Sequence, residues 1–207
     1  MRKFSASDLV KKSASQILYL TLKKIRLTPT PGQYKGDKHA EEVVKKEEAS
    51  SEKRGVVELD DSLVFFCVDM VKDNKYVEIK MVEDMEDYPD WYLHSSIMQA
   101  TLYASLLQDV KYLDTPKFRK KEGYKQEVIL VAKNPIFELW FGEDKYEIYP
   151  DSQVKEHYLN KAKLIESCIA NMDYSTCREF DSRYKFKEFE LFKPLYKKIV
   201  REEYELG

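Results

Sequence analysis

Hydrophobic and polar positions first follow a helical period and later change to the period of strands. Through residues 5–26 the apolar side chains recur at roughly helical spacing, which predicts one or two helices. These side chains are Leu9, Ile17, Leu20 and Ile25. Two prolines and two glycines mark residues 27–36 as a loop. A further helix is predicted to begin at Asp37 and to become a charged surface segment towards residue 54.

From Gly55 onward the pattern is that of β-strands. Three stretches rich in valine, isoleucine and phenylalanine predict a meander of three antiparallel strands. They read "GVVELDD", "SLVFFCVDMV" and "KYVEIKMVE", and they are separated by polar turns at Asp60-Asp61 and Asp73-Asn74. The middle of the chain therefore begins a β-sheet.

The second half alternates again between helix and sheet. A helix is predicted over residues 88–110, because one stripe of apolar side chains follows a helical period there. The stripe consists of Leu93, Ile97, Ala100, Ala104 and Leu107. Further strands are predicted between residues 126 and 150, and residues 152–207 are predicted to be mostly helical. This order of elements predicts the α/β (α+β) class, with a central mixed β-sheet flanked by helices.

Length and composition fit a single soluble domain. The chain has 207 residues, enough for one domain with a core. We assign to that domain residues 1–207, with N-terminal helices at 5–50, a catalytic sheet and helix at 55–110, strands at 126–150 and a helical region at 152–207. Hydrophobic residues make up 43% and charged residues 35% of the chain, and no apolar run is long enough to span a membrane. We therefore expect a cytoplasmic protein without membrane contact.

Charge and cysteine content narrow the function classes further. The net charge of -2 argues against a generally basic nucleic-acid coat, although local basic patches occur at residues 23–26 and 117–125. The second patch makes Lys117, Arg119, Lys120 and Lys121 candidates for contacts with a nucleic-acid backbone, with a solvated loop as the alternative. Cys67, Cys168 and Cys177 lack a CxxC spacing, which argues against a disulfide framework and a zinc site.

The stretch "VDMVKDNKYVEIK" carries the candidate chemistry. If its turn is centred on the Asp-Asn pair at 73 and 74, cross-strand partners have numbers that add up to 147, so Asp69 faces Glu78. Directly opposed residues have Cβ atoms about 4.5–5.5 Å apart, and like charges there weaken a sheet. Lys80 points to the same face as Glu78, because side chains alternate along a strand.

Two carboxylates beside a lysine suit a divalent cation bound by oxygen ligands, with Mg²⁺ or Mn²⁺ as the expected ion. A charged sheet surface that faces solvent is the alternative interpretation. The flanking stretches "VFFCV" and "YVEIKMV" are hydrophobic, which favours a position beside a core.

Three polar side chains on predicted helices extend this hypothesis. His39 falls in the first turn of the helix predicted from Asp37, where its neighbours are compatible with a structural histidine or with a metal ligand. Gln99 and Tyr103 are four residues apart and project from one helix face. An amide and a phenol can bind phosphate oxygens or a base, but the same residues are common on helix surfaces.

Five segments, taken together, resemble the PD-(D/E)XK nuclease superfamily, and within it the branch of RecB-type nuclease domains and CRISPR-associated adaptation nucleases. In that branch an S-x-S-x-L helix start, a helix histidine, an aspartate after a strand, a D/E-x-K and a Q-x-x-x-Y helix occur in this order. The resemblance spans roughly residues 5–110 and implies the restriction-endonuclease-like fold. The segments are "SASDL" (5–9), "GDKHAEE" (36–42), "VDMV" (68–71), "VEIK" (77–80) and "QATLY" (99–103).

The resemblance implies a centre for one or two Mg²⁺ or Mn²⁺ ions. Lys80 would orient or activate the attacking water, and Gln99 and Tyr103 match the motif that contacts DNA and supports the site. We favour the orienting role for Lys80, because adjacent carboxylates raise the pKa of a lysine. The implied ligands are His39, Asp69, Glu78 and the main-chain carbonyl of Ile79.

Some positions depart from the pattern of the branch. The "VEIK" segment has glutamate where the RecB branch usually has aspartate, which the superfamily pattern allows. Residues 13–15 read "SAS" where relatives often have Cys-Pro, and "FFCVD" lacks the glycine that frequently precedes the aspartate. No cysteine quartet brackets the domain, so we expect no iron–sulfur cluster.

The residues and the resemblance together predict a divalent-metal-dependent deoxyribonuclease, an exonuclease in DNA processing, recombination or repair. The expected partner is single- or double-stranded DNA, with a second copy of the chain or a recombination, CRISPR or phage protein as further candidates. Three alternatives stay open: a catalytically inactive subunit for DNA binding or assembly, a cap-snatching-like RNA endonuclease, and a structural protein whose acidic hairpin binds nothing. The "QATLY" helix favours the DNA-processing branch over the RNA endonuclease.

Overall fold

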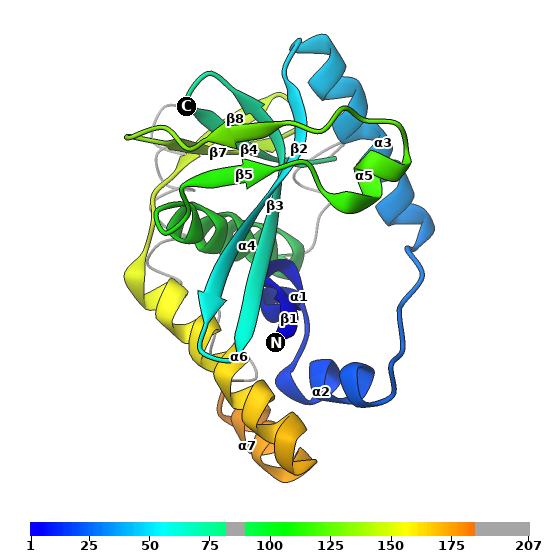
Figure 1. Cartoon of the computed structure of the whole chain (residues 1–207), viewed down its shortest axis with the longest axis vertical. Coiled ribbons are helices and arrows are strands. Elements are labelled where there is room, and N and C mark those ends of the chain that lie inside the picture. Colours follow the sequence, from blue (N-terminus) through cyan, green and yellow to red (C-terminus); the bar gives the residue numbers. More distant parts are fainter. Residues whose placement is uncertain (82–89, 185–207) are drawn as a thin grey trace.

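One β-sheet organises the computed structural model, which describes residues 1–81 and 90–184 (Figure 1). The strands follow the order β6-β5-β2-β3-β4-β7-β8, and β1 pairs with β3 outside this path. The strands are β1 Arg2–Ser5, β2 Ser50–Leu59, β3 Ser62–Lys72, β4 Lys75–Lys80, β5 Tyr112–Asp114, β6 Val128–Leu130, β7 Ile136–Phe141 and β8 Asp144–Ile148. The helices are α1 Ala6–Lys11, α2 Ala14–Leu22, α3 Pro31–Lys46, α4 Asp90–Leu107, α5 Lys117–Lys121, α6 Ser152–Asn171 and α7 Tyr174–Tyr184. The pairs β1–β3 and β4–β7 are parallel and the others antiparallel, which confirms a mixed sheet flanked by helices.

The predicted three-stranded meander is confirmed as β2, β3 and β4. Its register agrees with the sum of 147, because Met70 pairs with Val77 and two further pairs follow towards the turn. Asp60 and Asp73 sit in the turns with φ angles of 47° and 56°. Aspartate tolerates this left-handed region better than most residues, since its short polar side chain can hydrogen-bond locally.

The N-terminal segment differs from its prediction in two ways. The chain begins with the short strand β1, which pairs with the start of β3 and was not predicted. Helix α3 begins at Pro31 instead of Asp37, so His39 lies in the middle of the helix and not in its first turn. The reason is a capping box: the side chain of Thr30 accepts from the backbone of Gln33 at 3.3 Å, and Gln33 Oε1 accepts from the backbone of Thr30 at 2.6 Å. Proline is compatible with the first helical turn, where no intrahelical donor is needed.

The charged segment after α3 is not a solvated helix end. The helix stops at Lys46, and β2 already begins at Ser50, five residues before the predicted start of the sheet. The basic patch at 117–125 contains the short helix α5 instead of only a loop. Both errors have one cause. The start of β2 and helix α5 are rich in charged side chains, which hide the hydrophobic period of a short segment.

Most of the later elements follow the prediction, except the short strand β5, which was not predicted. Helix α4 carries the apolar stripe, strands β6 to β8 fall between residues 126 and 150, and α6 and α7 occupy the described part of the C-terminal region. Residues 82–89 and 185–207 lie outside the described residues, and with them the predicted start of the helix at 88 and the end of the helical region. No helix within the described ranges combines the length and apolar character that a membrane span requires.

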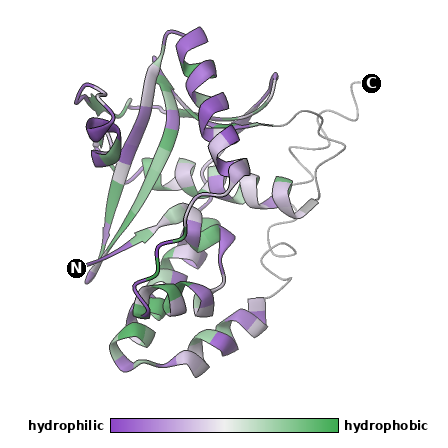
Figure 2. Cartoon of the chain, turned by 90° about the vertical axis from the view of Figure 1, so that its right-hand side faces the viewer, coloured by the Kyte–Doolittle hydropathy of each residue, from purple (hydrophilic) through white to green (hydrophobic). Residues whose placement is uncertain are grey.

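The two faces of the sheet are packed differently. On one face α1, α2, α4 and α6 bury a large apolar core against β3, β4 and β7. On the other face a small cluster joins Val44 of α3 to Met70, Val77, Ile79 and Trp140. Figure 2 shows α3 as a largely hydrophilic helix, in keeping with Val44 as its one buried side chain. Because Met70, Val77 and Ile79 face α3, strand alternation turns Glu78 towards α4.

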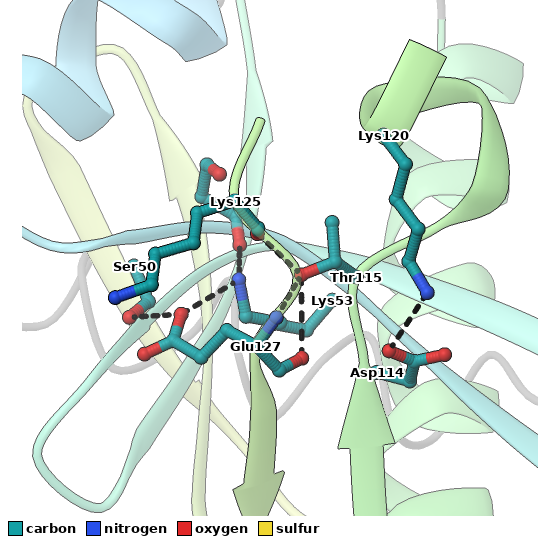
Figure 3. A network of polar contacts seen from close by, with 8 residues as sticks. Ser50, Lys53, Asp114, Thr115, Lys120, Lys125 and Glu127 are labelled. Carbon is teal, nitrogen blue, oxygen red and sulfur yellow. Dashed lines mark hydrogen bonds and ion pairs between the residues drawn. The ribbon is translucent and has the colours of Figure 1, made fainter. Parts of the chain in front are cut away.

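A polar network joins β2 to the ends of β5 and β6 (Figure 3). Lys53 is only 2% exposed, and its ammonium donates to the carbonyl of Ser51 at 2.9 Å and pairs with Glu127 at 3.1 Å. Ser50 Oγ donates to the same carboxylate at 3.1 Å. Thr115 Oγ1 in turn accepts from the backbone of Glu127 at 3.1 Å. The buried ammonium is therefore held between well-placed acceptors.

Candidate active site at the fork of strands β3 and β4

The candidate site lies where β4 leaves β3. The ladder between these strands ends at Met70 and Val77, and β4 continues along β7 as far as Lys80. The predicted cross-strand pair of Asp69 with Glu78 is therefore not formed. In its place, Asp69 Oδ2 accepts a hydrogen bond from the amide of Ile79 at 2.7 Å. The half-buried carboxylate of Asp69 is thus fixed, at the point where the two strands separate, by β4, the strand that carries Glu78.

Glu78, Lys80 and Gln99 form a buried hydrogen-bonded triangle. Lys80 Nζ donates to Glu78 Oε1 at 2.5 Å, and Gln99 Nε2 donates to the same oxygen at 2.6 Å. The ammonium also reaches Gln99 Oε1 at 3.3 Å. Since Glu78 and Lys80 are two residues apart on β4, alternation places both towards α4. One oxygen of the glutamate is held in this way, while Oε2 makes no hydrogen bond with the described residues.

Gln99 and Tyr103 of α4 are buried next to the site and are not exposed to solvent. Each is only 3% exposed, because residues 96–107 of α4 are buried on all sides. Tyr103 accepts from Gln99 Nε2 at 3.1 Å, and its ring packs 5.5 Å from that of Phe66. Gly55 makes this packing possible, since a Cβ at that position would lie 2.4 Å from the ring of Phe66. The interpretation as ordinary surface residues is therefore wrong.

The charges of the cluster are out of balance. Burial and the nearby Glu78 carboxylate raise the pKa of Asp69 well above its ordinary value. Burial opposes the charged form of Lys80, but Glu78 and Asp69 outweigh it and raise its pKa, so that Lys80 is an ammonium. Burial, followed by Glu78, also raises the pKa of Tyr103, which keeps the phenol neutral. An additional positive charge near the carboxylates would relieve this imbalance.

The cluster opens into a cleft of about 1280 Å³. The residues of the cluster that line it are Asp69, Glu78 and Lys80, together with the backbone segment at Ile79. The other walls come from α1, α2, the loop that leads to α3, the start of α3 and the start of α4. Residues far apart in the sequence therefore meet around the fork.

Lys11 of α1 is a second cation at the cluster that sequence reasoning missed. It lines the cleft and is exposed to solvent. Partial burial of its ammonium and the nearby charge of Lys80 lower its pKa to about 8. Glu78, Asp69 and Asp8 act in the opposite direction, so the ammonium lies within their electrostatic reach. Asp37 of α3 also lines the cleft, and burial raises its pKa. No local pattern marks either residue, because charged side chains on helices usually face solvent.

The C-terminal helices hold the wall that carries Lys11. Lys161 of α6 is buried, and its ammonium donates to the carbonyls of Leu9 at 2.8 Å and Lys12 at 2.9 Å. These carbonyls belong to the end of α1, where helix carbonyls lack intrahelical partners. Asp181 of α7 similarly accepts from the backbone of Ala14 at 2.7 Å, at the start of α2. The cleft wall is therefore positioned by residues from the other end of the described chain.

A divalent metal fits the carboxylates but not the whole implied ligand set. Asp69 Oδ1 and Glu78 Oε2 make no hydrogen bonds with described residues, and hard cations prefer such carboxylate oxygens. His39 does not line the cleft, and its Nε2 is buried without a hydrogen-bond partner in the described part of the chain. Within residues 1–81 and 90–184, no three His, Cys, Asp or Glu side chains are gathered as a metal site. The structure thus joins Asp69 to Glu78 but does not join His39 to them.

The basic residues of α5 lie outside this cleft. Arg119 forms ion pairs with Glu41 at 2.6 Å, Glu52 at 2.8 Å and Glu122 at 3.0 Å, beside a second cavity of about 260 Å³ that shares Asp69 with the cleft. Lys120 lies 3.5 Å from Asp114, and Lys117 and Lys121 are exposed. Contacts between these residues and a nucleic-acid backbone stay a prediction.

The fold is consistent with the restriction-endonuclease-like class. No family model and no curated protein matches the sequence. Among solved structures, the crystal structure of SSO0001 matches with a TM-score of 0.52 and 17% identity, over 81% of this chain and 76% of that chain. The crystal structure of LHK-Exo in complex with dAMP matches with a TM-score of 0.39 and 11% identity, over 87% of this chain and 92% of that chain. At these identities the similarity concerns the fold alone.

Proposed function

We propose that this chain is a metal-dependent nuclease that hydrolyses DNA phosphodiester bonds, as an exonuclease in DNA processing, recombination or repair. The observation that carries the proposal is the group of Asp69, Glu78 and Lys80 at one end of a large cleft. Two carboxylates with unengaged oxygens beside an ammonium are the groups that phosphodiester hydrolysis needs. The choice of DNA rests on the order of the sequence motifs, which resembles that of RecB-type nucleases.

Asp69 and Glu78 would hold one or two Mg²⁺ or Mn²⁺ ions through Oδ1 and Oε2. When bound, such an ion supplies positive charge beside the scissile phosphate and lowers the pKa of a water molecule. The backbone amide of Ile79 fixes the other oxygen of Asp69, and Lys80 with Gln99 fixes the other oxygen of Glu78. Both carboxylates are therefore preorganised, which avoids the free-energy cost of ordering them during the reaction.

Lys80 acts as a donor and not as a base. Its raised pKa keeps the amine protonated, so it orients a water molecule or a phosphate oxygen through its N–H groups. Lys11 adds a second ammonium to the same cleft and stabilises negative charge on a phosphate. The proton of the attacking water must leave to solvent or to a phosphate oxygen, because both lysines are charged near neutral pH.

The test is cleavage of end-labelled single-stranded DNA, double-stranded DNA and RNA in the presence of Mg²⁺, Mn²⁺ or EDTA. We expect metal-dependent release of nucleotides from DNA ends. The substitution Glu78→Gln should lower the rate about 100-fold or more, the size of loss seen when one preorganised transition-state contact is removed.

Glu138→Gln is the matched control. Glu138 is a buried glutamate on the neighbouring strand β7, where it accepts from Lys75 at 2.6 Å and from Trp140 at 2.8 Å, and it does not line the cleft. It should retain cleavage. Activity that persists in EDTA or in Glu78→Gln would contradict the proposal. Cleavage of RNA alone would favour the cap-snatching type, and Mn²⁺ binding without any cleavage would favour an inactive subunit.

A further inference from the structure

The two tryptophans of the chain have opposite environments. Trp140 is 6% exposed, donates from Nε1 to Glu138 at 2.8 Å and lies under the ammonium of Lys145. Trp91 is 66% exposed at the start of α4. Burial of a tryptophan ring ordinarily stabilises a fold, and Trp91 leaves most of its indole accessible to a ligand.

The exposed Trp91 is part of the lining of the cleft. It lines the same cleft as Glu78 and Lys80. Along α4 it precedes Gln99, which contacts both residues, by eight positions or about 12 Å of helix rise. That distance corresponds to roughly three stacked nucleotides at about 3.4 Å each.

Cations, the carboxylates of Asp8 and Asp37, and apolar side chains line the rest of this cleft. The loop between α2 and α3, which runs along one side of the molecule in Figure 1, contributes Arg26 between the exposed side chains of Ile25 and Leu27. Lys3 and Lys11 are exposed on the cleft wall formed by β1 and α1. Within the described residues these three cations take part in no ion pair, so they are available to an anionic ligand.

We propose that the cleft binds an unpaired strand of nucleic acid, with one base stacked on Trp91 and the sugar–phosphate backbone along Arg26, Lys3 and Lys11. A basic groove with an aromatic platform is how proteins bind single strands without sequence readout. In a duplex each base is already paired and stacked, so its face cannot reach the indole. The inference rests on the proposed function, because the bound strand would lead to the cluster of Glu78 and Lys80.

Charge selects this occupant over an apolar one. A hydrophobic peptide would cover Trp91, Ile25 and Leu27, but it would leave Lys3 and Arg26 without an anionic partner. A strand of nucleic acid supplies a phosphate for the cations and a flat apolar face for the indole in each nucleotide. Binding should therefore weaken with added salt, because neutralised phosphates release counterions.

Tryptophan fluorescence in EDTA tests the inference without cleavage. Single-stranded oligo(dT) should quench the wild-type emission, and the substitution Trp91→Phe should abolish the quenching, because the buried Trp140 is then the only indole. Anisotropy of labelled oligo(dT) should show near-normal binding for Trp91→Phe, whose ring still stacks. Trp91→Leu should bind about fivefold to 100-fold more weakly, the range reported by removal of one stacking platform.

Tyr112→Leu is the matched control, since Tyr112 is a half-exposed aromatic residue on β5 outside the cleft. It should bind oligo(dT) like the wild type, and circular dichroism should show that all variants are folded. Normal binding by Trp91→Leu, or equal quenching by a duplex of the same sequence, would overturn the inference.

The inference and the proposed function can fail separately. If duplex DNA is cleaved with Mg²⁺ and Trp91→Leu cleaves at the normal rate, the nuclease proposal stands and the stacking inference is wrong. If oligo(dT) quenches Trp91 but no substrate is cleaved with any metal, the stacking inference stands and the nuclease proposal is wrong.

Discussion

Two buried lysines of one sheet, Lys53 on β2 and Lys80 on β4, have opposite electrostatic surroundings. Lys53 pairs with Glu127, and this hydrogen bond lowers the pKa of the carboxyl, so the ionised pair is favoured in the folded state. Lys80 pairs with Glu78, but burial and the nearby Glu78 carboxylate raise the pKa of the neighbouring Asp69, and the single ammonium does not offset them. The first arrangement stabilises the fold, whereas the second is typical of sites that bind a cation or carry out chemistry.

The largest expected difference concerns activity. Lys80→Met removes the ammonium from the cleft and should lower the rate of DNA cleavage per folded molecule about 100-fold or more. Lys53→Met should leave that rate unchanged, since Lys53 does not line the cleft. Initial rates with end-labelled DNA and Mg²⁺ measure both. Equal losses in the two variants would mean that the two lysines have the same role.

Lys53→Met should instead lower the stability of the fold. Its loss leaves the carbonyl of Ser51 and the carboxylate of Glu127 without their donor, and hydrogen bonds to charged groups contribute about 1.5–3 kcal/mol each. We expect the free energy of unfolding of Lys53→Met, measured in urea, to fall by about that amount. An unchanged urea midpoint would contradict the structural role of the pair.

Asp69→Asn should make the metal-free protein more stable, by about 0.5–2 kcal/mol. Asparagine keeps an acceptor for the amide of Ile79 and removes one of the two opposed charges. The folded pKa of Asp69 lies above its ordinary value of 3.8, so in EDTA wild-type stability falls as the pH rises through the folded pKa, and the variant lacks this contribution.

Thermal unfolding of Asp69→Asn with and without metal completes this measurement. Saturating Mn²⁺ should raise the Tm of the wild type by mass action and should leave that of the variant nearly unchanged. A variant that is less stable than the wild type in EDTA would show that the carboxylate of Asp69 is part of a stabilising ion pair, like Glu127.

The smallest expected effect is at Glu127. Its folded pKa lies below the ordinary value of 4.5, so the stability gained from its ionised form is complete above that pH and is lost as the pH falls through the folded pKa. Glu127→Gln should flatten the acid limb of a plot of Tm against pH. The carboxylate is half exposed, so solvent screening keeps the effect small. Coinciding acid limbs would contradict the lowered pKa.

Strand periodicity could predict the centre of the site. The alternation of "VEIK" and the short turn after Lys72 were enough to predict the register, and the pairs from Met70 and Val77 onward confirm it. They could not reveal that the ladder stops there while β4 continues along β7, because β7 is distant in the sequence. The hydrogen bond between Asp69 and Ile79 follows from that separation.

The walls of the site could not be predicted in the same way. The spacing of Gln99 and Tyr103 predicted a shared face, but burial of that face comes from the strands beneath α4. Lys11 and Asp37 reach the cleft only because α1 and α3 pack around it, and the same packing leaves His39 outside the lining of the cleft. The local sequence pattern determines which residues share one face of a helix, whereas tertiary packing determines what that face contacts.

The contacts that hold the end of α1 form late during protein synthesis. Lys161 contacts the carbonyl of Leu9 across a sequence separation of 152 residues. A chain emerging from the ribosome therefore has β1, the meander and α4 outside the exit tunnel well before the lysine that holds α1. Until α6 emerges, the end of α1 has no ammonium to bind, and the wall that carries Lys11 is not secured. The cleft becomes complete only after most of the chain has been translated.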